Sequence, residues 1–245
     1  MTAPLVEVVI PVLNEEDDLR KSVVYLRQFL ESHSPYPCRI VIADNGSTDQ
    51  TPGIAEMLSK EYSEVSWIHL EMRGRGRALR KAWLESDADI LSYMDVDLST
   101  DLNAFPALVR AIGEEGFDLA IGSRLMKGSV VKKRSFKREL TSRSYNLIIK
   151  AAFFTRFSDA QCGFKAISRR AVQALVPRVK DQAWFFDSEL LILAEKAGYR
   201  IKDVPVEWVD DPDSRVKVLK TATEDLKGLL RLRAGGLSQA LKSLR

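Results

Sequence analysis

Short apolar segments alternate with amphipathic ones along the first half of the chain, and this alternation constrains the fold most. Four of the apolar segments are typical of buried strands: Val6–Ile10, Arg39–Ala43, Val65–Leu70 and Ala88–Met94. Helical segments separate them, the first with apolar residues at helical spacing from Leu19 to Leu30. Strands that alternate with helices predict a mostly parallel sheet with helices on both faces. The expected fold class is therefore α/β.

The second half of the chain adds helices and strands to this pattern. We expect a helix over Leu102–Glu114, a strand over Phe117–Ile121, a long helix from Arg138 and a β segment over Ile201–Val209. One face of the long helix is apolar, which favours burial in the core over membrane contact, and consists of Leu140, Leu147, Ile148, Ala151 and Phe154. A last amphipathic helix breaks at Gly235-Gly236. The short basic helix beyond it could rest on an anionic bilayer, fray, or contact another subunit.

Two carboxylates one residue apart follow the fourth predicted strand. Asp95 and Asp97 come directly after the apolar run that ends at Met94. In an extended backbone, residues i and i+2 face the same side, so both carboxylates can point at one cation. Mg²⁺ or Mn²⁺ would complete its shell with substrate phosphates. The alternative is a solvated turn, but ligands bind at the carboxyl ends of strands in such sheets, where the loops at Asn14 and Asp44 also lie.

A glycine and arginine segment follows the third predicted strand. Arg73-Gly74-Arg75-Gly76 stands between that strand and a helix, and only partly matches a dinucleotide fingerprint, since Leu79 takes the place of the third glycine. A helix amino terminus with interleaved arginines suits a diphosphate, so Arg75 and Gly76 are candidate ligand-binding residues. A solvated basic loop is the alternative.

Composition limits the partners of such a site. The 245 residues carry a formal net charge of +3, with a local excess at Lys132, Lys133, Arg134, Lys137, Arg138 and Arg143. This distribution fits phosphate-bearing or anionic-membrane partners rather than nucleic acid. Two cysteines, Cys38 and Cys162, exclude a disulfide framework and a cysteine-based zinc site. Without a recognisable signal peptide or membrane-spanning run, we expect a cytoplasmic protein, soluble or peripheral at the inner face of the membrane.

An ordered set of motifs over about residues 6–215 resembles the family 2 glycosyltransferases of the GT-A fold, and among them the polyprenyl (dolichyl) phosphate sugar synthases. The motifs are Pro11-Val12-Leu13-Asn14-Glu15, Asp44-Asn45-Gly46-Ser47-Thr48-Asp49, Arg73-Gly74-Arg75-Gly76, Asp95-Val96-Asp97, Gly122-Ser123-Arg124, Gln161-Cys162-Gly163-Phe164-Lys165 and Trp184-Phe185-Phe186-Asp187-Ser188-Glu189. The later motifs resemble the glucosyltransferase branch, which uses UDP-glucose. Asp-Val-Asp-Leu-Ser is nearer the mannosyl type, which uses GDP-mannose, so both donors stay open.

The resemblance implies roles for individual residues. Asp44 would contact the base of the nucleotide, and Asn14 and Glu15 would shape the base and ribose pocket. Asp95 and Asp97 would hold Mg²⁺ or Mn²⁺ on the diphosphate. The full nucleotide-binding set is Pro11, Asn14, Glu15, Asp44, Gly46, Arg75, Gly76, Asp95 and Arg215, and Arg215 would close over the site.

The acceptor decides whether the site needs a base. We expect inverting displacement at the anomeric carbon. A phosphomonoester has a second pKa near 6 and is largely ionised at neutral pH, so a polyprenyl phosphate needs cations, and the family pattern offers Arg124 and Arg138. A sugar hydroxyl would need a carboxylate base, Asp187 or Glu189. A sugar nucleotidyltransferase is a rival, although such enzymes usually place their glycine-arginine loop after the first strand. A nucleotide-sugar sensor has no positive feature.

The expected organisation is one glycosyltransferase domain over residues 1–233, with a nucleotide-sugar half at 6–121 and an acceptor half at 122–215. Residues 234–245 form the basic amphipathic tail. The expected partners are a nucleotide sugar and a polyprenyl phosphate. Access to that lipid calls for peripheral membrane contact or a membrane partner subunit, because no membrane helix is recognisable.

Overall fold

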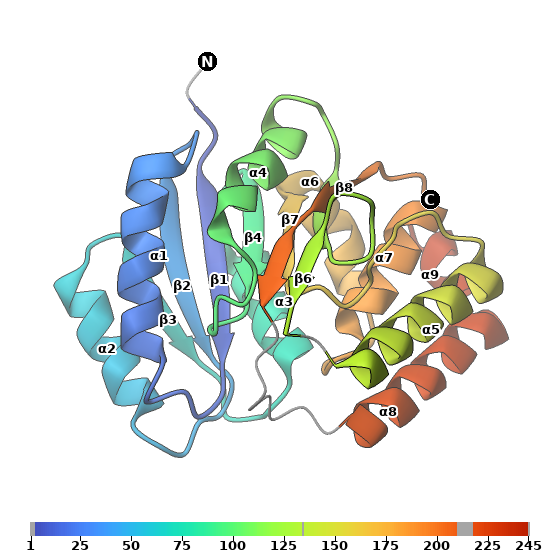
Figure 1. The fold of residues 1–245 in the computed structure, drawn as a ribbon, viewed down its shortest axis with the longest axis horizontal. Coiled ribbons are helices and arrows are strands. Elements are labelled where there is room, and N and C mark those ends of the chain that lie inside the picture. The colour runs from blue at the N-terminus through green and yellow to red at the C-terminus, as the bar shows by residue number, and fades with distance from the viewer. Residues whose placement is uncertain (1–2, 134, 210–217, 245) are drawn as a thin grey trace.

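The computed structural model describes residues 3–133, 135–209 and 218–244, arranged around a central sheet (Figure 1). Its strand order is β3-β2-β1-β4-β7-β5-β8. The strands are β1 (Val6–Val12), β2 (Cys38–Asp44), β3 (Val65–His69), β4 (Ile90–Met94), β5 (Leu119–Ser123), β7 (Phe164–Ser168) and β8 (Ile201–Pro205). A separate parallel pair consists of β6 (Val130–Lys132) and β9 (Glu207–Val209).

Parallel pairing dominates the sheet, as the sequence predicts. β1 pairs in parallel with β2 and β4, β2 with β3, and β5 with β8. β7 runs antiparallel between β4 and β5. All residues of β4 and β5 are buried, as expected for strands covered on both faces. The predicted fold class, a mostly parallel α/β sheet flanked by helices, is confirmed.

Helices cover both faces of the sheet (Figure 1). Alternate residues of β1 divide the core, with Val8 and Ile10 on one side and Val9 on the other. The first side packs against α1 (Leu19–His33), α2 (Thr51–Glu61) and α4 (Phe105–Gly113). The second packs against α3 (Arg75–Glu85), α5 (Phe136–Phe153), α6 (Arg169–Leu175), α7 (Phe186–Lys196), α8 (Val218–Arg231) and α9 (Leu237–Lys242).

The prediction that the apolar face of α5 is part of the core is wrong. Leu140, Leu147, Ile148 and Phe154 are 54%, 67%, 47% and 76% exposed. The buried face is the opposite one, where Ile149 and Phe153 join the core beside two buried polar residues, Ser142 and Asn146. Periodicity misleads here because apolar residues occur on both sides of the helix, so helical spacing alone does not identify the side that packs.

The structure refines three further predictions of helices and strands. The expected segment Ile201–Val209 divides at Val206 into β8 and β9, and the expected helix from Leu102 begins as a 3₁₀ turn before α4. Gly235 breaks the last helix with a φ of +115°. Beyond it, partly buried apolar residues of α9 and of the residues that follow pack against the core: Leu237, Ala240, Leu241 and Leu244. Every helix among the described residues is too short or too polar to span a bilayer.

The contact between α3 and α7 depends on the absence of a side chain at Gly76. A Cβ at this position would lie 2.6 Å from the Cβ of Phe186, which is buried. We expect Gly76→Ala to lower the free energy of unfolding by about 1–3 kcal/mol, because the fully packed interface has no room for a methyl group. Urea denaturation measures this change.

Gly53→Ala is the matched control, because Gly53 lies in α2 and its added Cβ would meet only the Gln50 Oε1 atom, at 3.9 Å. Alanine in an open helix position stabilises by up to about 1 kcal/mol. Equal effects of the two substitutions would contradict the assigned packing.

Candidate active site

Asp95 and Asp97 lie where β4 ends, at the carboxyl edge of the sheet. The side chain of Asp95 is 45% exposed, and Asp97 is exposed. They lie in a turn rather than in the extended backbone expected from the sequence: Leu98 N donates to Asp95 O, and Leu98 has a φ of +48°. Both residues nevertheless line one small hollow of about 10 Å³. The turn therefore brings the predicted pair together by a different backbone path.

Contacts with β9 fix the position of this turn. Val209 N donates to Ser99 O, and Asp101 N donates to Glu207 O. Thr100 also forms a bridge with Trp208. The backbone after Asp97 is therefore held on a second strand pair, which limits its movement relative to the sheet.

Gly163 forms the wall behind Asp95. A Cβ at Gly163 would lie 1.8 Å from Asp95 Oδ2, inside the carboxylate itself. The Gly163 carbonyl also accepts a hydrogen bond from Asp95 N at 3.3 Å. Only glycine leaves room for this carboxylate, so Gly163 positions Asp95. The sequence indicated Gly163 only as one residue of a motif.

A buried ionic network connects Asp95 to the interior. The Arg75 guanidinium donates to Asp95 Oδ1 and to Asp187 Oδ2, both at 2.7 Å. Asp187 also accepts from the Tyr93 hydroxyl at 2.5 Å and lies 3.2 Å from Lys165 Nζ. Burial alone raises the pKa of Asp187, but the charges of Lys165 and Arg75 outweigh burial and leave this pKa below its ordinary value. Asp187 is therefore an ionised, fully bonded carboxylate.

The other candidate base, Glu189, is bonded in the same way. Its carboxylate accepts from the backbone amides of Lys180 and Asp181, at 3.1 and 2.9 Å. Arg231 donates to both of its oxygens, at 2.9 and 2.6 Å. Glu189 is 2% exposed, as is Asp187. Both carboxylates are thus engaged within the protein and shielded from solvent.

The loops after β1 and β2 brace each other on the expected nucleotide side. Asn14 has a φ of +56°. Its amide donates to Ser47 Oγ and its Oδ1 accepts from Thr48 N, both at 2.8 Å. Glu15 N donates to Thr51 Oγ1 at 2.7 Å. The motifs that begin at Pro11 and Asp44 therefore form one hydrogen-bonded unit at the end of two adjacent strands.

Asp44 and Gly46 shape the turn after β2. Asp44 is fully buried, accepts from Ser47 N at 3.1 Å and lies 2.6 Å from the Nδ1 atom of His69. Gly46 has a φ of +78°, which a side chain would strain. His69, which the sequence suggested to be structural or on the surface, thus contacts a predicted binding residue. His69 stands at the end of β3, and this position was the sequence feature that could have indicated a role in the site.

The sequence predicted that Arg75 and Gly76 form an open phosphate-binding site. In the structure both residues instead bond to other groups of the protein. The amides of Gly76 and Arg77 donate to the carbonyls of Ala183 and Gln182, at 3.2 and 3.0 Å. These carbonyls occupy the amino end of α3, so the Gly76 amide is already bonded within the protein. Arg75 points inward to the carboxylates, with its guanidinium 5.1 Å from the centre of the Trp184 ring.

The predicted acceptor residues come from two elements. Arg124 follows β5 and forms two hydrogen bonds with the buried carboxylate of Asp159, at 2.7 and 3.0 Å. Its guanidinium lies over the Trp208 ring, 5.3 Å from its centre. Burial lowers the pKa of Arg124, but Asp159 outweighs this and raises it above its ordinary value. Arg138 lies in the first turn of α5, where its amide donates to the capping Ser135. Arg215 lies outside the described residues.

Sequence reasoning missed three network residues as site residues: Tyr93, Asp159 and Lys165. Tyr93 resembles an ordinary strand residue, and Asp159 and Lys165 resemble polar residues of a turn. Lys165 is 2% exposed and bonds Tyr93 Oη at 3.0 Å. The only sequence signal was a lysine in an otherwise apolar strand, which would need a buried partner.

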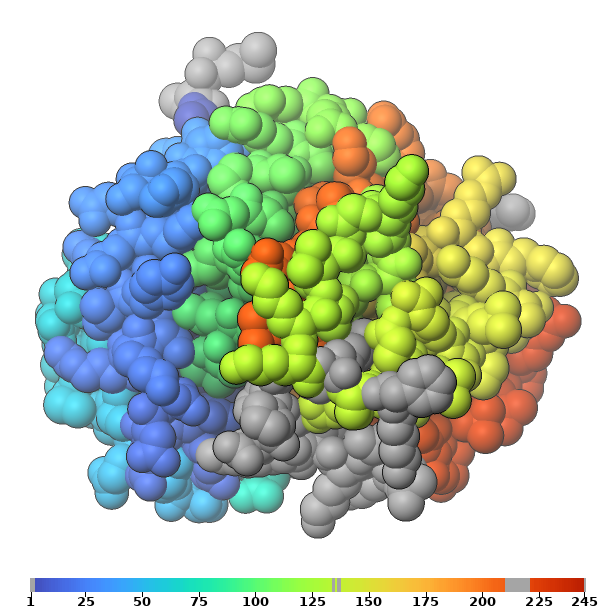
Figure 2. Space-filling model, viewed as in Figure 1, coloured from blue at the N-terminus to red at the C-terminus, as the bar shows by residue number. Residues whose placement is uncertain are grey.

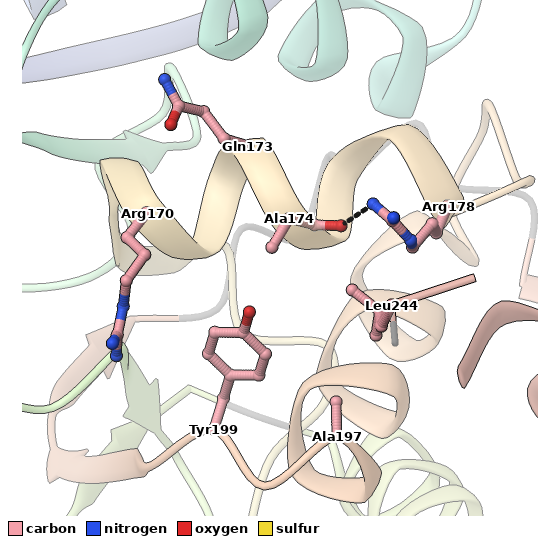
Figure 3. A pocket seen from close by; sticks show the side chains of 7 residues that line it. All are labelled: Arg170, Gln173, Ala174, Arg178, Ala197, Tyr199 and Leu244. Carbon is pink, nitrogen blue, oxygen red and sulfur yellow. Dashed lines mark hydrogen bonds between the residues drawn. The ribbon is translucent and has the colours of Figure 1, made fainter. Parts of the chain in front are cut away.

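A larger hollow, of about 480 Å³, lies at the opposite edge of the sheet (Figure 3). Its lining consists of Arg170, Gln173, Ala174, Arg178, Ala197, Tyr199 and Leu244. Arg178 donates to the Ala174 carbonyl, and Arg170 pairs with Asp118. The cations of this hollow are thus used within the protein, and the hollow is separate from the predicted site.

The protein-family model for "Glycosyl transferase family 2" matches residues 7–176 of this chain. The chain belongs to this family. The glycosyltransferase AglD of Haloferax volcanii is 37% identical over 217 residues, which are 88% of this chain and 35% of AglD. The dolichyl-phosphate beta-glucosyltransferase of Saccharomyces cerevisiae is 27% identical over 92% of this chain and 73% of its own length. The chain thus spans about a third of AglD and most of the yeast relative.

Solved structures confirm the GT-A fold of this family 2 glycosyltransferase. Glucosyl-3-phosphoglycerate synthase from Mycobacterium tuberculosis, in complex with Mn²⁺, UDP-glucose and phosphoglyceric acid, superposes with a TM-score of 0.71. The match covers 95% of this chain and 80% of the synthase, at 18% identity. At this identity the likeness concerns the fold alone.

The residues at the end of β4 fit a hard divalent cation. Asp95 and Asp97 offer oxygen ligands at the carboxyl edge of the sheet, and the absence of a side chain at Gly163 leaves room for the Asp95 carboxylate. Within the described ranges, no group of three or more acidic, histidine or cysteine side chains could hold a metal ion by itself. Two protein carboxylates suit a cation that takes its remaining ligands from a diphosphate and water.

Gly163→Ala tests whether the position of Asp95 controls cation binding. The added methyl group must displace the carboxylate, so we expect Mn²⁺-dependent binding of UDP to weaken by at least about tenfold, the typical effect of disturbing residues that support a ligand. Isothermal titration calorimetry measures the affinity, with Gly53→Ala as the control. Unchanged affinity in a variant with an intact fold would contradict this role.

Asp225 of α8 makes stability depend on pH. It is 2% exposed, and Gln161 Nε2 donates to its Oδ2 at 3.0 Å. Burial, followed by the charge of Asp181, raises its pKa from 3.8 to about 7. The folded state then holds this proton more tightly, so stability falls as pH rises between about 4 and 7. We expect Asp225→Asn to match the wild type near pH 4 and to be more stable at pH 8 in urea denaturation. An equal pH dependence would contradict the assignment.

Proposed function

We propose that this glycosyltransferase transfers a hexose with inversion from a nucleotide sugar to a polyprenyl phosphate, at the cytoplasmic face of a membrane and with Mg²⁺ or Mn²⁺. The names of the yeast and AglD relatives support the reaction class. The observation that carries the proposal is the state of Asp187 and Glu189, the two carboxylates that a hydroxyl acceptor would need as candidate bases. Asp187 and Glu189 are buried and fully engaged, and an ionised phosphate acceptor needs no base.

The metal site would bind the donor. Asp95 and Asp97 would hold the cation, which when bound neutralises the diphosphate as it leaves. Arg75 orients Asp95 from the protein side, through its hydrogen bond at 2.7 Å. The braced loops at Asn14 and Asp44 would receive the nucleotide at the adjacent strand ends. Asp187 then acts on the donor side through Arg75, as a positioning residue.

The acceptor would meet guanidinium groups. A lipid phosphate is largely ionised at neutral pH. Arg124 is held in one orientation by Asp159 and Trp208, and Arg138 lies at the amino end of α5. Charge-assisted hydrogen bonds from such groups orient a phosphate for attack. UDP-glucose is the proposed donor because the yeast relative is named a dolichyl-phosphate beta-glucosyltransferase, and GDP-mannose is the alternative suggested by Asp-Val-Asp-Leu-Ser.

Product analysis tests the proposal. The chain is incubated with UDP-glucose or GDP-mannose, Mn²⁺ and a short-chain polyprenyl phosphate, and products are identified by mass spectrometry. We expect a lipid-linked phosphohexose and free nucleoside diphosphate. In parallel incubations, conversion of the nucleotide sugar and added pyrophosphate to a nucleoside triphosphate and a sugar 1-phosphate would indicate a nucleotidyltransferase. Transfer to the hydroxyl of an added sugar would indicate a base-dependent enzyme, and binding without product would indicate a sensor. Each of these three results contradicts the proposal.

Two substitutions separate donor from acceptor binding. We expect Asp97→Asn to lower turnover by at least about a hundredfold, because charge stabilisation of the leaving group is lost. The control is Asp17→Asn, at an exposed aspartate of another loop, and it should have no effect.

We expect Arg138→Ala to raise the KM for the short-chain lipid phosphate by about tenfold without changing UDP affinity. Arg143→Ala, on the other side of α5, is its control. Equal KM values for Arg138→Ala and wild type would remove Arg138 from the acceptor site.

A further inference from the structure

The outward face of α5 is apolar along its length. Leu140, Leu147 and Ala151 follow one another at intervals of seven and four residues, which places them on one line of the helix, and Phe154 directly follows the last residue of α5. Each is exposed, and Phe154 is 76% exposed. The buried residues Ile149 and Phe153 lie on the opposite side. A helix that presents this row to water is normally covered by something.

A second exposed apolar pair lies on α8, at the same end of the molecule (Figure 1). Leu226 and Leu230 are 51% and 61% exposed and lie one turn apart. The two helices are neighbours, because Arg233, just beyond α8, donates to the Ala152 carbonyl of α5 at 3.2 Å. Their buried faces share one core. Figure 2 shows the α5 segment, in the colours of residues 136–153, on the outer surface of this end.

The charges around these exposed apolar residues indicate the chemistry of the surface that they contact. Residues 132–156 contain eight Lys or Arg side chains and a single Glu. Arg143 and Lys150 stand beside the row on α5, and exposed Lys227 and Arg233 stand beside the pair on α8. Apolar residues flanked by cations match the interface of an anionic bilayer, in which acyl chains lie beneath negatively charged headgroups. A protein partner would have to supply an acidic rim around an apolar groove.

We propose that the outer faces of α5 and α8 dock on an anionic lipid bilayer, with Leu140, Leu147, Phe154, Leu226 and Leu230 entering the headgroup region. This inference rests on the proposed lipid acceptor. It adds the orientation of the protein on the membrane. Arg138, a predicted phosphate ligand, lies on the same helix as the docking row, two residues before Leu140, which places it on the other side of α5. A bilayer against the docking row would therefore lie on the side of α5 away from that arginine.

Vesicle sedimentation of the full chain tests the docking without donor or acceptor. The vesicles contain phosphatidylcholine, with or without phosphatidylglycerol. We expect wild type to bind the anionic vesicles, and high salt to weaken the binding. The double variant Leu147→Glu with Phe154→Glu should bind at least about tenfold more weakly, because two apolar contacts are lost and two negative charges are added. Thermal melting checks that this variant folds.

The control is Tyr25→Glu with Met57→Glu. These side chains are 58% and 55% exposed, on α1 and α2 away from the docking face, and the control should bind like wild type. Absence of wild-type binding, or equal loss in both double variants, would overturn the proposal. Light scattering that shows a dimer of wild type and a monomer of Leu147→Glu with Phe154→Glu would overturn it in favour of a second copy.

Turnover distinguishes this proposal from the proposed function. On a water-soluble, short-chain lipid phosphate, Leu147→Glu with Phe154→Glu should keep wild-type activity, and on a long-chain acceptor in anionic vesicles it should lose at least about tenfold. Wild-type turnover of the soluble acceptor together with no vesicle binding would refute the docking and leave the function standing. Vesicle binding without any glycosyl product would refute the function and leave the docking standing.

Discussion

The site depends on one buried cation, the guanidinium of Arg75. It joins Asp95, at the mouth of the sheet, to Asp187, in the interior, through hydrogen bonds of 2.7 Å. Tyr93 and Lys165 complete the coordination of Asp187. Removing one partner from such a buried pair typically costs about 3–5 kcal/mol, because the remaining charge is left without compensation. The network therefore fixes Asp95 from behind and leaves its exposed side for a ligand.

This arrangement requires elements that are far apart in sequence to meet at one edge. β4 supplies Asp95, the antiparallel β7 follows directly on Gly163, and α3 and α7 supply Arg75 and Asp187. Close contacts at Gly76 and Gly163 leave no room for side chains, so the backbone itself determines how near these elements come. The same sheet edge receives the loops after β1 and β2, which are hydrogen-bonded to each other.

Local pattern was enough to predict much of this architecture. The alternation of strands and helices predicted the parallel sheet, and the abrupt end of an apolar run predicted the place of Asp95 and Asp97. The turn that joins them was not predictable from alternation, because it depends on contacts with β9. Lys165 and Asp159 were missed because their partners, Asp187 and Arg124, are 22 and 35 residues away along the chain. The exposed row of α5 was assigned to the core because a helix with apolar residues on both sides does not reveal which side packs.

The central claim is that Asp95 and Asp97 bind the cation of a nucleotide diphosphate. Anomalous diffraction from crystals soaked with Mn²⁺ and UDP tests it most directly. The account predicts a manganese peak within bonding distance of an oxygen of Asp95 or Asp97 and of a diphosphate oxygen, with Arg75 still bonded to Asp187. A manganese ion or a diphosphate bound elsewhere, for example beside Arg170 and Arg178, would contradict it.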